Sequence, residues 1–211
     1  MASACQFGRN KPLLAAMTAQ GDEFGRREQV LAVAERLILS RGSLNISLNV
    51  IAEELGVSRS LLYVYFESVP QIIDALFLEH ALWLDGLVTQ MHTVHSEFRP
   101  RMLGLFRGYL RHLAERGHLI QLVLRERHQD SPLQPESSRV FRRILLIIAR
   151  DVSRELQLAP RGAFVTLELL AAIPEALARL VRSGAVDVVV AMSTSERLLA
   201  AALDALEVRE P

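Results

Sequence analysis

The chain has 211 residues, and half of them are hydrophobic, so it is long enough to bury one sizeable core or two smaller ones. Its 24 basic residues equal its 24 acidic residues, which excludes the strongly basic footprint of many nucleic-acid-binding proteins. Residues 1–80 are slightly acidic, with seven Arg or Lys against nine Asp or Glu. Any contact with phosphates must therefore come from local placement of charge.

The cysteine content and the length of the apolar runs limit the cellular compartment in which the protein can act. Cys5 is the only cysteine, which excludes an intrachain disulfide and a zinc site built from several cysteines. The longest compact apolar run, ILLIIA at 144–149, is far shorter than the roughly 20 residues of a membrane-spanning helix. The first 28 residues lack the pattern of an export signal. We expect a cytoplasmic protein with no membrane partner, and a flexible N-terminal arm over residues 1–24.

Three short helices are expected next, in residues 25–72. Val30, Ala34, Leu37, Ile38 and Arg41 recur at the spacing of one helical face, and Gly42 ends that helix. A second stripe runs from Leu48 to Leu55, with Ser47 placed to cap its first turn. Ser58 is placed to cap a third helix over about 58–66.

Longer helices fill the rest of the chain. Ser68 precedes a long apolar-rich run to about residue 94, with Pro70 in the tolerated first turn. Further helices are predicted over 100–116, 118–128, 136–157, 160–182 and 187–207. Strand-like alternation is almost absent, and VDVVVA at 186–191 is the one ambiguous stretch. The fold class is therefore all-α, with a short-helix domain at 25–72 and a second helical domain at 73–211.

The link between the second and third helices predicts a helix-turn-helix. Two helices joined by so short a turn must approach closely, and Ala52 is small enough to face its neighbour. Gly56 tolerates the positive φ that the turn needs. The expected core of this unit is Ile51, Ala52, Leu55, Gly56, Val57, Leu62 and Phe66.

Residues 30–73 resemble the DNA-binding domain of the TetR family of bacterial transcriptional regulators. The motifs that carry the resemblance are A-x-x-L-x-x-x-x-G (34–42), IA-x-x-L-G-V-S (51–58) and LLYVYF (61–66). The resemblance implies a homodimeric regulator, most simply a repressor released by an unknown small-molecule effector. It would bind a near-palindromic double-stranded DNA operator.

The resemblance also assigns roles on the recognition helix. Tyr63 and Tyr65 would place hydroxyls on phosphates, while Arg59 and Ser60 would face base edges. Leu61 would either touch a thymine methyl group or add to the core. The complete set of DNA-binding candidates is Ser47, Ser58, Arg59, Ser60, Leu61, Tyr63 and Tyr65. The chain departs from the family at Ile46, where threonine is common, at Val69, where lysine is common, and at Leu61, where a small polar residue is often found. The first two departures remove expected phosphate contacts, so we expect weaker or narrower DNA binding than is usual in the family.

Two further sites are expected in the second domain. Aromatic and polar residues on its first helices suggest an effector pocket, with ordinary core packing as the alternative: His80, Trp83, Phe106, Tyr109 and His112. Four arginines are candidate partners for an acidic effector or plain surface charges: Arg107, Arg111, Arg125 and Arg127. Residues 162–181 and 196–208 are apolar on more than one face, which indicates a dimer interface or a deeply buried helix. The interface candidates are Leu169, Ile173, Leu177, Leu198, Leu199 and Leu203.

No motif indicates catalysis, a cofactor or a metal. No serine–histidine–acid spacing, glycine-rich phosphate loop or carboxylate pair stands out, so we expect no enzymatic activity. His92 and His95 lie three residues apart, but the further ligands of a zinc site are missing. The alternative functions are a helical adaptor that binds protein and an enzyme without a recognisable motif.

Overall fold

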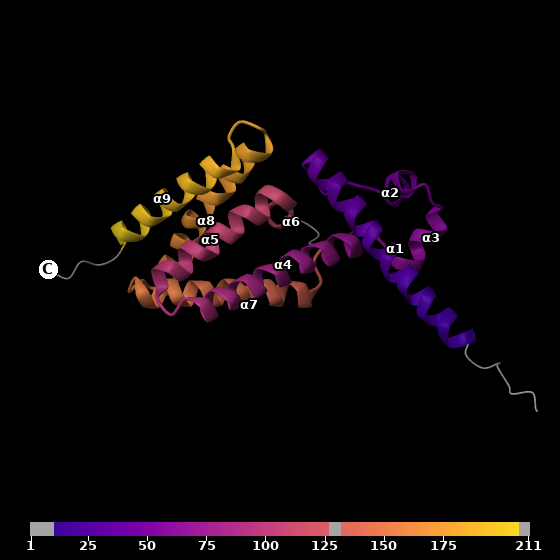
Figure 1. Ribbon diagram of the computed structural model, residues 1–211, viewed down its shortest axis with the longest axis horizontal. Coiled ribbons are helices and arrows are strands. Elements are labelled where there is room, and N and C mark those ends of the chain that lie inside the picture. The colour runs from indigo at the N-terminus through magenta and orange to yellow at the C-terminus, as the bar shows by residue number, and fades with distance from the viewer. Residues whose placement is uncertain (1–10, 127–131, 207–211) are drawn as a thin grey trace, which may run out of the picture. The chain divides into compact units, whose positions relative to one another are not determined.

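The structure, a computed structural model, describes residues 11–126 and 132–206, which form nine helices and no strand (Figure 1). The predicted all-α fold class is confirmed. The chain divides into two compact units, residues 1–72 and 73–211. The division falls in the first turn of α4 (Val69–Val94), so one continuous helix belongs to both units.

The first unit contains α1 (Lys11–Arg41), α2 (Leu48–Leu55) and α3 (Arg59–Tyr65). α1 begins at Lys11, so residues 11–24, which we expected in a flexible arm, are helical. The reason lies in composition, because LLAAM at 13–17 consists of strong helix formers and Pro12 occupies the tolerated first turn. Residues 1–10 lie outside the described residues, and side chains are described from residue 25 onward.

The core of the first unit follows the predicted helical faces. Val30, Ala34 and Ile38 on α1 are all at most 2 % exposed, and α1 packs against α2, which in turn packs against α3. Gly42 ends α1 with φ +62°, a left-handed conformation that favours glycine. Ile46 is buried, so the residue that replaces the family's usual threonine contributes to the core.

The second unit contains the rest of α4 and five further helices. They are α5 (Phe98–Arg116), α6 (Leu119–Arg125), α7 (Pro135–Glu155), α8 (Pro160–Arg182) and α9 (Val188–Leu206). The ambiguous stretch VDVVVA joins α9 from Val188 onward. The predicted helix over 118–128 ends at Arg125, and residues 127–131 lie outside the described residues.

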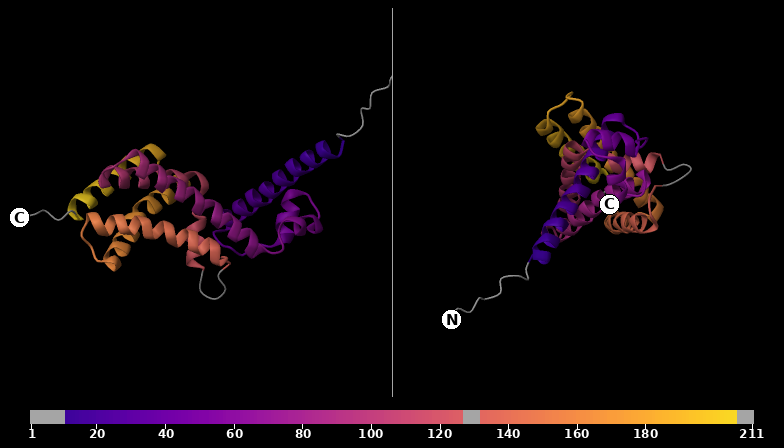
Figure 2. Two further views of the ribbon diagram at one scale, coloured as in Figure 1. Left: turned by 90° about the horizontal axis from the view of Figure 1, so that it is seen from below. Right: turned by 90° about the vertical axis from the view of Figure 1, so that its right-hand side faces the viewer.

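α5 is the central helix of this unit. It packs against both α8 and α9, which lie side by side as a hairpin (Figures 1 and 2), while α7 packs against α8. α5 also comes close to α4, because a Cβ atom at Gly108 would lie only 2.8 Å from the δ-carbons of Leu87. Ion pairs from Arg99 to Asp204 and from Arg107 to Glu196 join α5 to α9 on the surface.

Over the described part of the chain, no single helix is both long and apolar enough to cross a membrane. The bent pair formed by α3 and α4 meets those two criteria only when the helices are taken together.

Candidate nucleic-acid interface and internal cavity

The turn between α2 and α3 has the predicted geometry. The hydroxyl of Ser47 accepts the N–H of Val50 at 3.3 Å and caps the start of α2. Gly56 ends α2 in the left-handed region with φ +65°, and Val57 N–H donates to the carbonyl of Ala52 at 3.0 Å. The predicted serine cap and the positive φ at Gly56 are both confirmed.

α3 is held by its inner face. The hydroxyl of Ser58 accepts the N–H of Leu61 at 3.3 Å, as predicted for a helix cap. Leu62 and Phe66 are each 1 % exposed, and the guanidinium carbon of Arg27 lies 5.0 Å from the centre of the Phe66 ring. Both side chains are therefore buried in the core of the unit. Leu55 and Val57, also expected in the core, are only half-buried.

The outer face of α3 presents polar and apolar groups to solvent. Arg59, Ser60, Tyr63 and Val64 are all exposed. Arg59 Nη2 donates to the Tyr63 hydroxyl at 2.6 Å, one helical turn away, and its guanidinium carbon lies 5.3 Å from the centre of the Tyr63 ring. Tyr63 therefore fixes the direction of the Arg59 side chain in the free protein.

Two predicted contact residues do not share this face. Leu61 and Tyr65 are half-buried and border a small hollow with Val30 of α1. This packing favours the core role for Leu61. Val64, which sequence reasoning missed, is 66 % exposed. Its position four residues after Ser60 could have identified it, because residues i and i+4 share a helical face.

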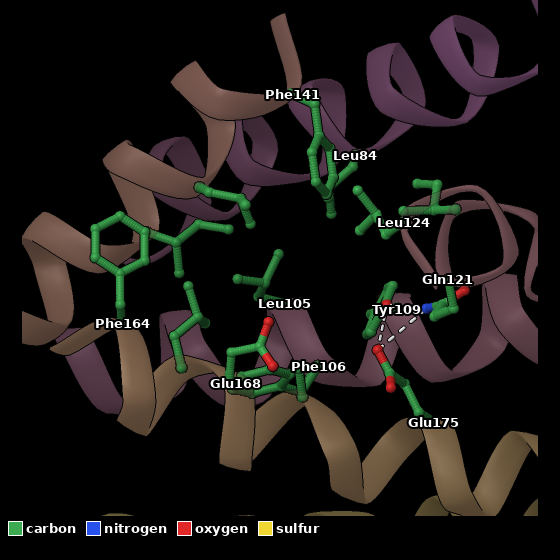
Figure 3. A pocket seen from close by; sticks show the side chains of 15 residues that line it. Leu84, Leu105, Phe106, Tyr109, Gln121, Leu124, Phe141, Phe164, Glu168 and Glu175 are labelled. Atoms are coloured by element: carbon green, nitrogen blue, oxygen red, sulfur yellow. Dashed lines mark hydrogen bonds between the residues drawn. The ribbon is translucent and has the colours of Figure 1, made fainter. Parts of the chain in front are cut away.

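The second unit contains a cavity of about 130 Å³ among α4, α5, α6, α7 and α8 (Figure 3). Eleven of its fifteen lining residues are apolar: Leu84, Leu105, Phe106, Ile120, Leu124, Phe141, Leu145, Ile148, Phe164, Leu167 and Ala171. The other four are Tyr109, Gln121, Glu168 and Glu175. The cavity is therefore a mainly apolar chamber with a few polar groups, the composition of small-molecule sites.

One end of the cavity holds a hydrogen-bonded triad. The hydroxyl of Tyr109 donates to Glu175 Oε1 at 2.9 Å, and Gln121 Nε2 donates to the same oxygen at 3.1 Å and to the Tyr109 hydroxyl (Figure 3). Burial, and then the negative charge of Glu175, raise the pKa of Tyr109 well above its usual value. Tyr109 therefore stays protonated and keeps donating to the carboxylate.

The five predicted pocket residues fall into two groups. Phe106 and Tyr109 line the cavity. His80, Trp83 and His112 pack on each other and line a much smaller hollow beside it, which shares Leu84 and Tyr109 with the cavity. His80 Nδ1 lies 2.7 Å from His112 Nε2, and the Trp83 ring stacks on His112 with ring centres 3.7 Å apart. The two histidines contact each other through ring nitrogens, and Leu84 is the residue of α4 that lines the cavity.

Sequence reasoning also missed the acidic lining, and of the two alternatives given for the arginines the structure favours surface charges. Glu168 and Glu175 are seven residues apart in the apolar stretch of α8, a spacing that could have placed them on one face. None of the candidate arginines within the described residues lines the cavity: Arg107 pairs with Glu196, while Arg111 and Arg125 are exposed. Arg127 lies outside the described residues.

The predicted interface residues differ in how far they are exposed to solvent. Leu169 and Leu198 are 66 % and 50 % exposed, and Ile173 and Leu177 are half-buried. Leu199 and Leu203 are at most 1 % exposed, so they belong to the interior of this unit and are withdrawn as interface residues. Further exposed apolar side chains on α8 and α9, missed from sequence, are Val165, Leu180, Val188, Val189 and Val190.

His92, near the end of α4, pairs with a carboxylate and not with His95. His92 Nε2 lies 2.8 Å from Asp151 Oδ2, and Asp151 also lies 3.2 Å from Arg101 Nε. Within the residues that the structure describes, no group of three or more His, Cys, Asp or Glu side chains is arranged to hold a metal ion.

Comparisons with known proteins agree with this architecture. Residues 30–76 match the family model described as bacterial regulatory proteins, tetR family. No curated protein matches the chain. A TetR family transcription regulator from Marinobacter aquaeolei VT8 has a similar structure, with a TM-score of 0.68, 17 % identity, and coverage of 87 % of this chain and 97 % of that one.

Two further solved structures share the fold. A TetR-like transcriptional regulator from Rhodococcus sp. RHA1 has a TM-score of 0.64 and 20 % identity over 85 % of this chain and 96 % of that one. The fatty acid degradation regulator FadR from Bacillus halodurans has a TM-score of 0.58 and 16 % identity over 82 % of this chain and 97 % of that one. The family match therefore assigns the helix-turn-helix over residues 30–76 to the tetR family of bacterial regulatory proteins, and the solved structures show that most of the chain shares the fold of such regulators.

Proposed function

We propose that this DNA-binding regulator is a cytoplasmic, ligand-responsive repressor that binds a near-palindromic operator as a homodimer. The observation that carries the proposal is the outer face of α3. Its exposed side chains combine a guanidinium, two hydroxyls and an apolar tip on a short helix that is anchored from below by Leu62 and Phe66. A short helix of this kind fits the major groove of DNA.

Each exposed group on α3 has a distinct task in this proposal. Arg59 reads a guanine with two hydrogen bonds, a contact worth about 1–3 kcal/mol of discrimination. Tyr63 donates its hydroxyl to a phosphate and so sets the register without reading sequence. Val64 touches a thymine methyl group, the role left open for Leu61. Binding requires Arg59 to exchange its 2.6 Å hydrogen bond with Tyr63 for a base edge.

Ser47 and Ser58 act mainly through the helix starts that they cap. Their hydroxyls already accept backbone N–H groups, so other N–H groups of the first turn of α2 remain for a phosphate. The unit has no excess of cations to add to these contacts, because acidic residues outnumber basic ones in residues 1–80 and Arg36 is paired with Glu54 at 2.6 Å. We therefore expect a shallow dependence of affinity on salt, since each neutralised phosphate contributes to that slope.

Dimerisation is assigned to the exposed face of α8 and α9. Val165 and Leu169 on α8, with Val190 and Leu198 on α9, are each at least 50 % exposed. A contiguous apolar patch on a single chain marks an interaction surface. A second copy of the same face would cover it in an isologous four-helix contact. Such a dimer would carry two helix-turn-helix units to half-sites about one helical turn apart.

Ligand response is assigned to the cavity. An effector that fills it contacts α4 at Leu84, and the same helix continues to the boundary with the first unit. Binding can change DNA affinity only as far as the effector prefers one arrangement of α4 over another. The effector therefore releases the operator by a shift of population.

The test uses fluorescence anisotropy with labelled DNA from the region upstream of the protein's own gene. Arg59→Ala should weaken specific binding by roughly 5- to 100-fold and relax preference at one base pair in each half-site. Tyr63→Phe should weaken binding to all sequences alike. Arg125→Ala, which removes an exposed arginine of the second unit, is the matched control and should change neither.

Unaltered binding in both α3 variants would overturn the assigned roles. The rival adaptor function would be favoured if the wild-type chain leaves the DNA free in dilute buffer but retains a protein partner from lysate after nuclease treatment.

A further inference from the structure

Among the residues that the structure describes, those lining the cavity in the second unit carry negative charge and no positive charge. Glu168 and Glu175 are the charged ones, and no described Arg, Lys or His lines the cavity. The remaining surface is almost entirely apolar, with Tyr109 and Gln121 as the other polar groups. An apolar chamber of this kind selects its ligand mainly through the few polar groups that it contains.

The two carboxylates are not equivalent. Glu175 already accepts hydrogen bonds from Tyr109 and Gln121, so its charge is partly satisfied within the protein. Glu168 has no hydrogen bond or ion pair with any described residue, and it lies on the same face of α8, two helical turns earlier. It is an exposed residue, so its carboxylate lies where the cavity opens to solvent. In Figure 3 its carboxylate points toward the space between Leu105 and Phe106. Glu168 is therefore the group with unused capacity to bind a ligand.

We propose that the cavity selects a small amphiphile with an apolar body and one protonated amine, and that Glu168 receives the amine. This rests on the effector site proposed above and gives its ligand a chemical class. A charge-assisted hydrogen bond from an ammonium to a carboxylate is roughly twice as strong as a neutral one. The rings of Phe106 and Phe164 also line the cavity and add a favourable environment for a cation.

Size and charge together define which ligands are excluded. A dry cavity of about 150 Å³ lined by Leu, Ile and Phe holds a benzene ring, so about 130 Å³ is suited to a body near that size. A carboxylate on the ligand would face the negative charges of both Glu168, which is exposed, and Glu175, which is half-buried, and like charges repel each other. Fatty acids and other anionic amphiphiles are therefore poor ligands for this chain, whatever a structural neighbour binds.

The test compares three probes of matched size on the full-length protein at pH 7.5. They are 2-phenylethylamine, 2-phenylethanol and phenylacetate, which carry a positive, a neutral and a negative end on the same ring. Isothermal titration calorimetry should give the order amine, alcohol, carboxylate, with the amine at least about tenfold tighter than the alcohol. Equal affinities, tightest binding of phenylacetate, or no binding of any probe would each overturn the proposal.

Two variants test the role of Glu168. Glu168→Gln keeps the shape of the side chain and removes the charge, so it should bring the amine to within about threefold of the alcohol. Glu155→Gln, at the exposed end of α7, is the control and should leave the tenfold preference in place. A preference for the amine that survives Glu168→Gln would overturn the assignment to Glu168.

DNA binding without ligand separates this proposal from the proposed function. Normal operator binding by the free protein, with no preference among the probes, removes only the ligand class. Retained amine preference in a protein that binds no DNA removes the repressor function and leaves the amine site intact.

Discussion

The candidate functional side chains of the first unit point outward to solvent, whereas those of the second unit point inward to a cavity. In the first unit, Arg59 and Tyr63 point outward from a helix of seven residues whose inner face is the core. In the second unit, Tyr109 and Glu175 point inward, and side chains from five helices are needed to form one cavity. An outward surface depends on one helix being held in place, whereas an inward site depends on the packing of the whole unit.

This difference determines how each unit tolerates change. A substitution on the outer face of α3 alters DNA contacts and leaves stability nearly unchanged, because exposed positions contribute little to folding. A substitution in the lining of the cavity alters ligand binding and packing together, because interiors are densely packed. Variants that affect one unit without the other are therefore the sharpest way to test the comparison.

The largest expected effect comes from Leu169→Asp on the proposed dimer face. By two-fold symmetry each dimer would bury two unpaired carboxylates, which should weaken dimerisation by about 4 kcal/mol, on the order of 1,000-fold. Sedimentation should then show monomers, and operator affinity should fall although the first unit is unchanged. Leu82→Asp, at an α4 position that is 52 % exposed, is the control and should remain dimeric. A Leu169→Asp protein that stays dimeric would place the interface elsewhere.

The next effect distinguishes two adjacent leucines on α3. Leu62 is 1 % exposed, so Leu62→Ala should lower the free energy of unfolding by about 3 kcal/mol through lost burial and a residual cavity. Leu61 is only half-buried, so Leu61→Ala should cost about 1 kcal/mol. Urea denaturation measures both. A loss in Leu61→Ala as large as in Leu62→Ala would mean that α3 is seated differently.

Local features of the first unit could be predicted from sequence because their causes lie within a few residues. Ser47 and Ser58 cap the helices that begin next to them, and Gly56 follows the helix that it ends. The alternation of buried and exposed side chains on α3 was harder to predict. Val64 was missed because an apolar residue is normally assigned to the core, and exposure on an anchored short helix follows only from the packing of Leu62 and Phe66.

The cavity could be predicted only in outline because its members are far apart in sequence. Phe106 and Tyr109 were found from their aromatic character, but Gln121 and Glu175 meet Tyr109 only when α5, α6 and α8 pack together. His80 and His112 looked suited to a ligand, and in the folded chain they contact each other. Periodicity indicates which face of a helix is apolar, and it does not indicate which neighbour that face meets.

Replacing a glycine by alanine should change stability by a smaller amount, with opposite signs at Gly56 in the first unit and Gly86 in the second. Gly56 has φ +65°, so Gly56→Ala should lower stability by about 1 kcal/mol through backbone strain. Gly86 lies exposed inside α4 with open space around its Cα, so Gly86→Ala should raise stability by roughly 0.5–1 kcal/mol. Thermal unfolding measures both shifts. Changes of the same sign would contradict the contrast between a turn and a helix interior.

The smallest expected effect is a pH dependence at the junction of α5, α6 and α8. Arg182 donates to the Leu113 carbonyl at 2.7 Å and lies 3.0 Å from His118 Nδ1. Burial, and then the charges of Arg182 and Arg125, lower the pKa of His118 below its usual value. The unfolded chain therefore takes up a proton near pH 6.5 while the folded chain does not, so stability is complete above about pH 6.5 and falls below it. The loss should stay under about 1 kcal/mol because solvent screens this partly exposed site.

His118→Asn keeps an acceptor for Arg182 and removes the titration, so its unfolding curves at pH 7 and pH 5 should differ less than those of the wild type. An equal difference in both proteins would show that other groups cause the acid dependence.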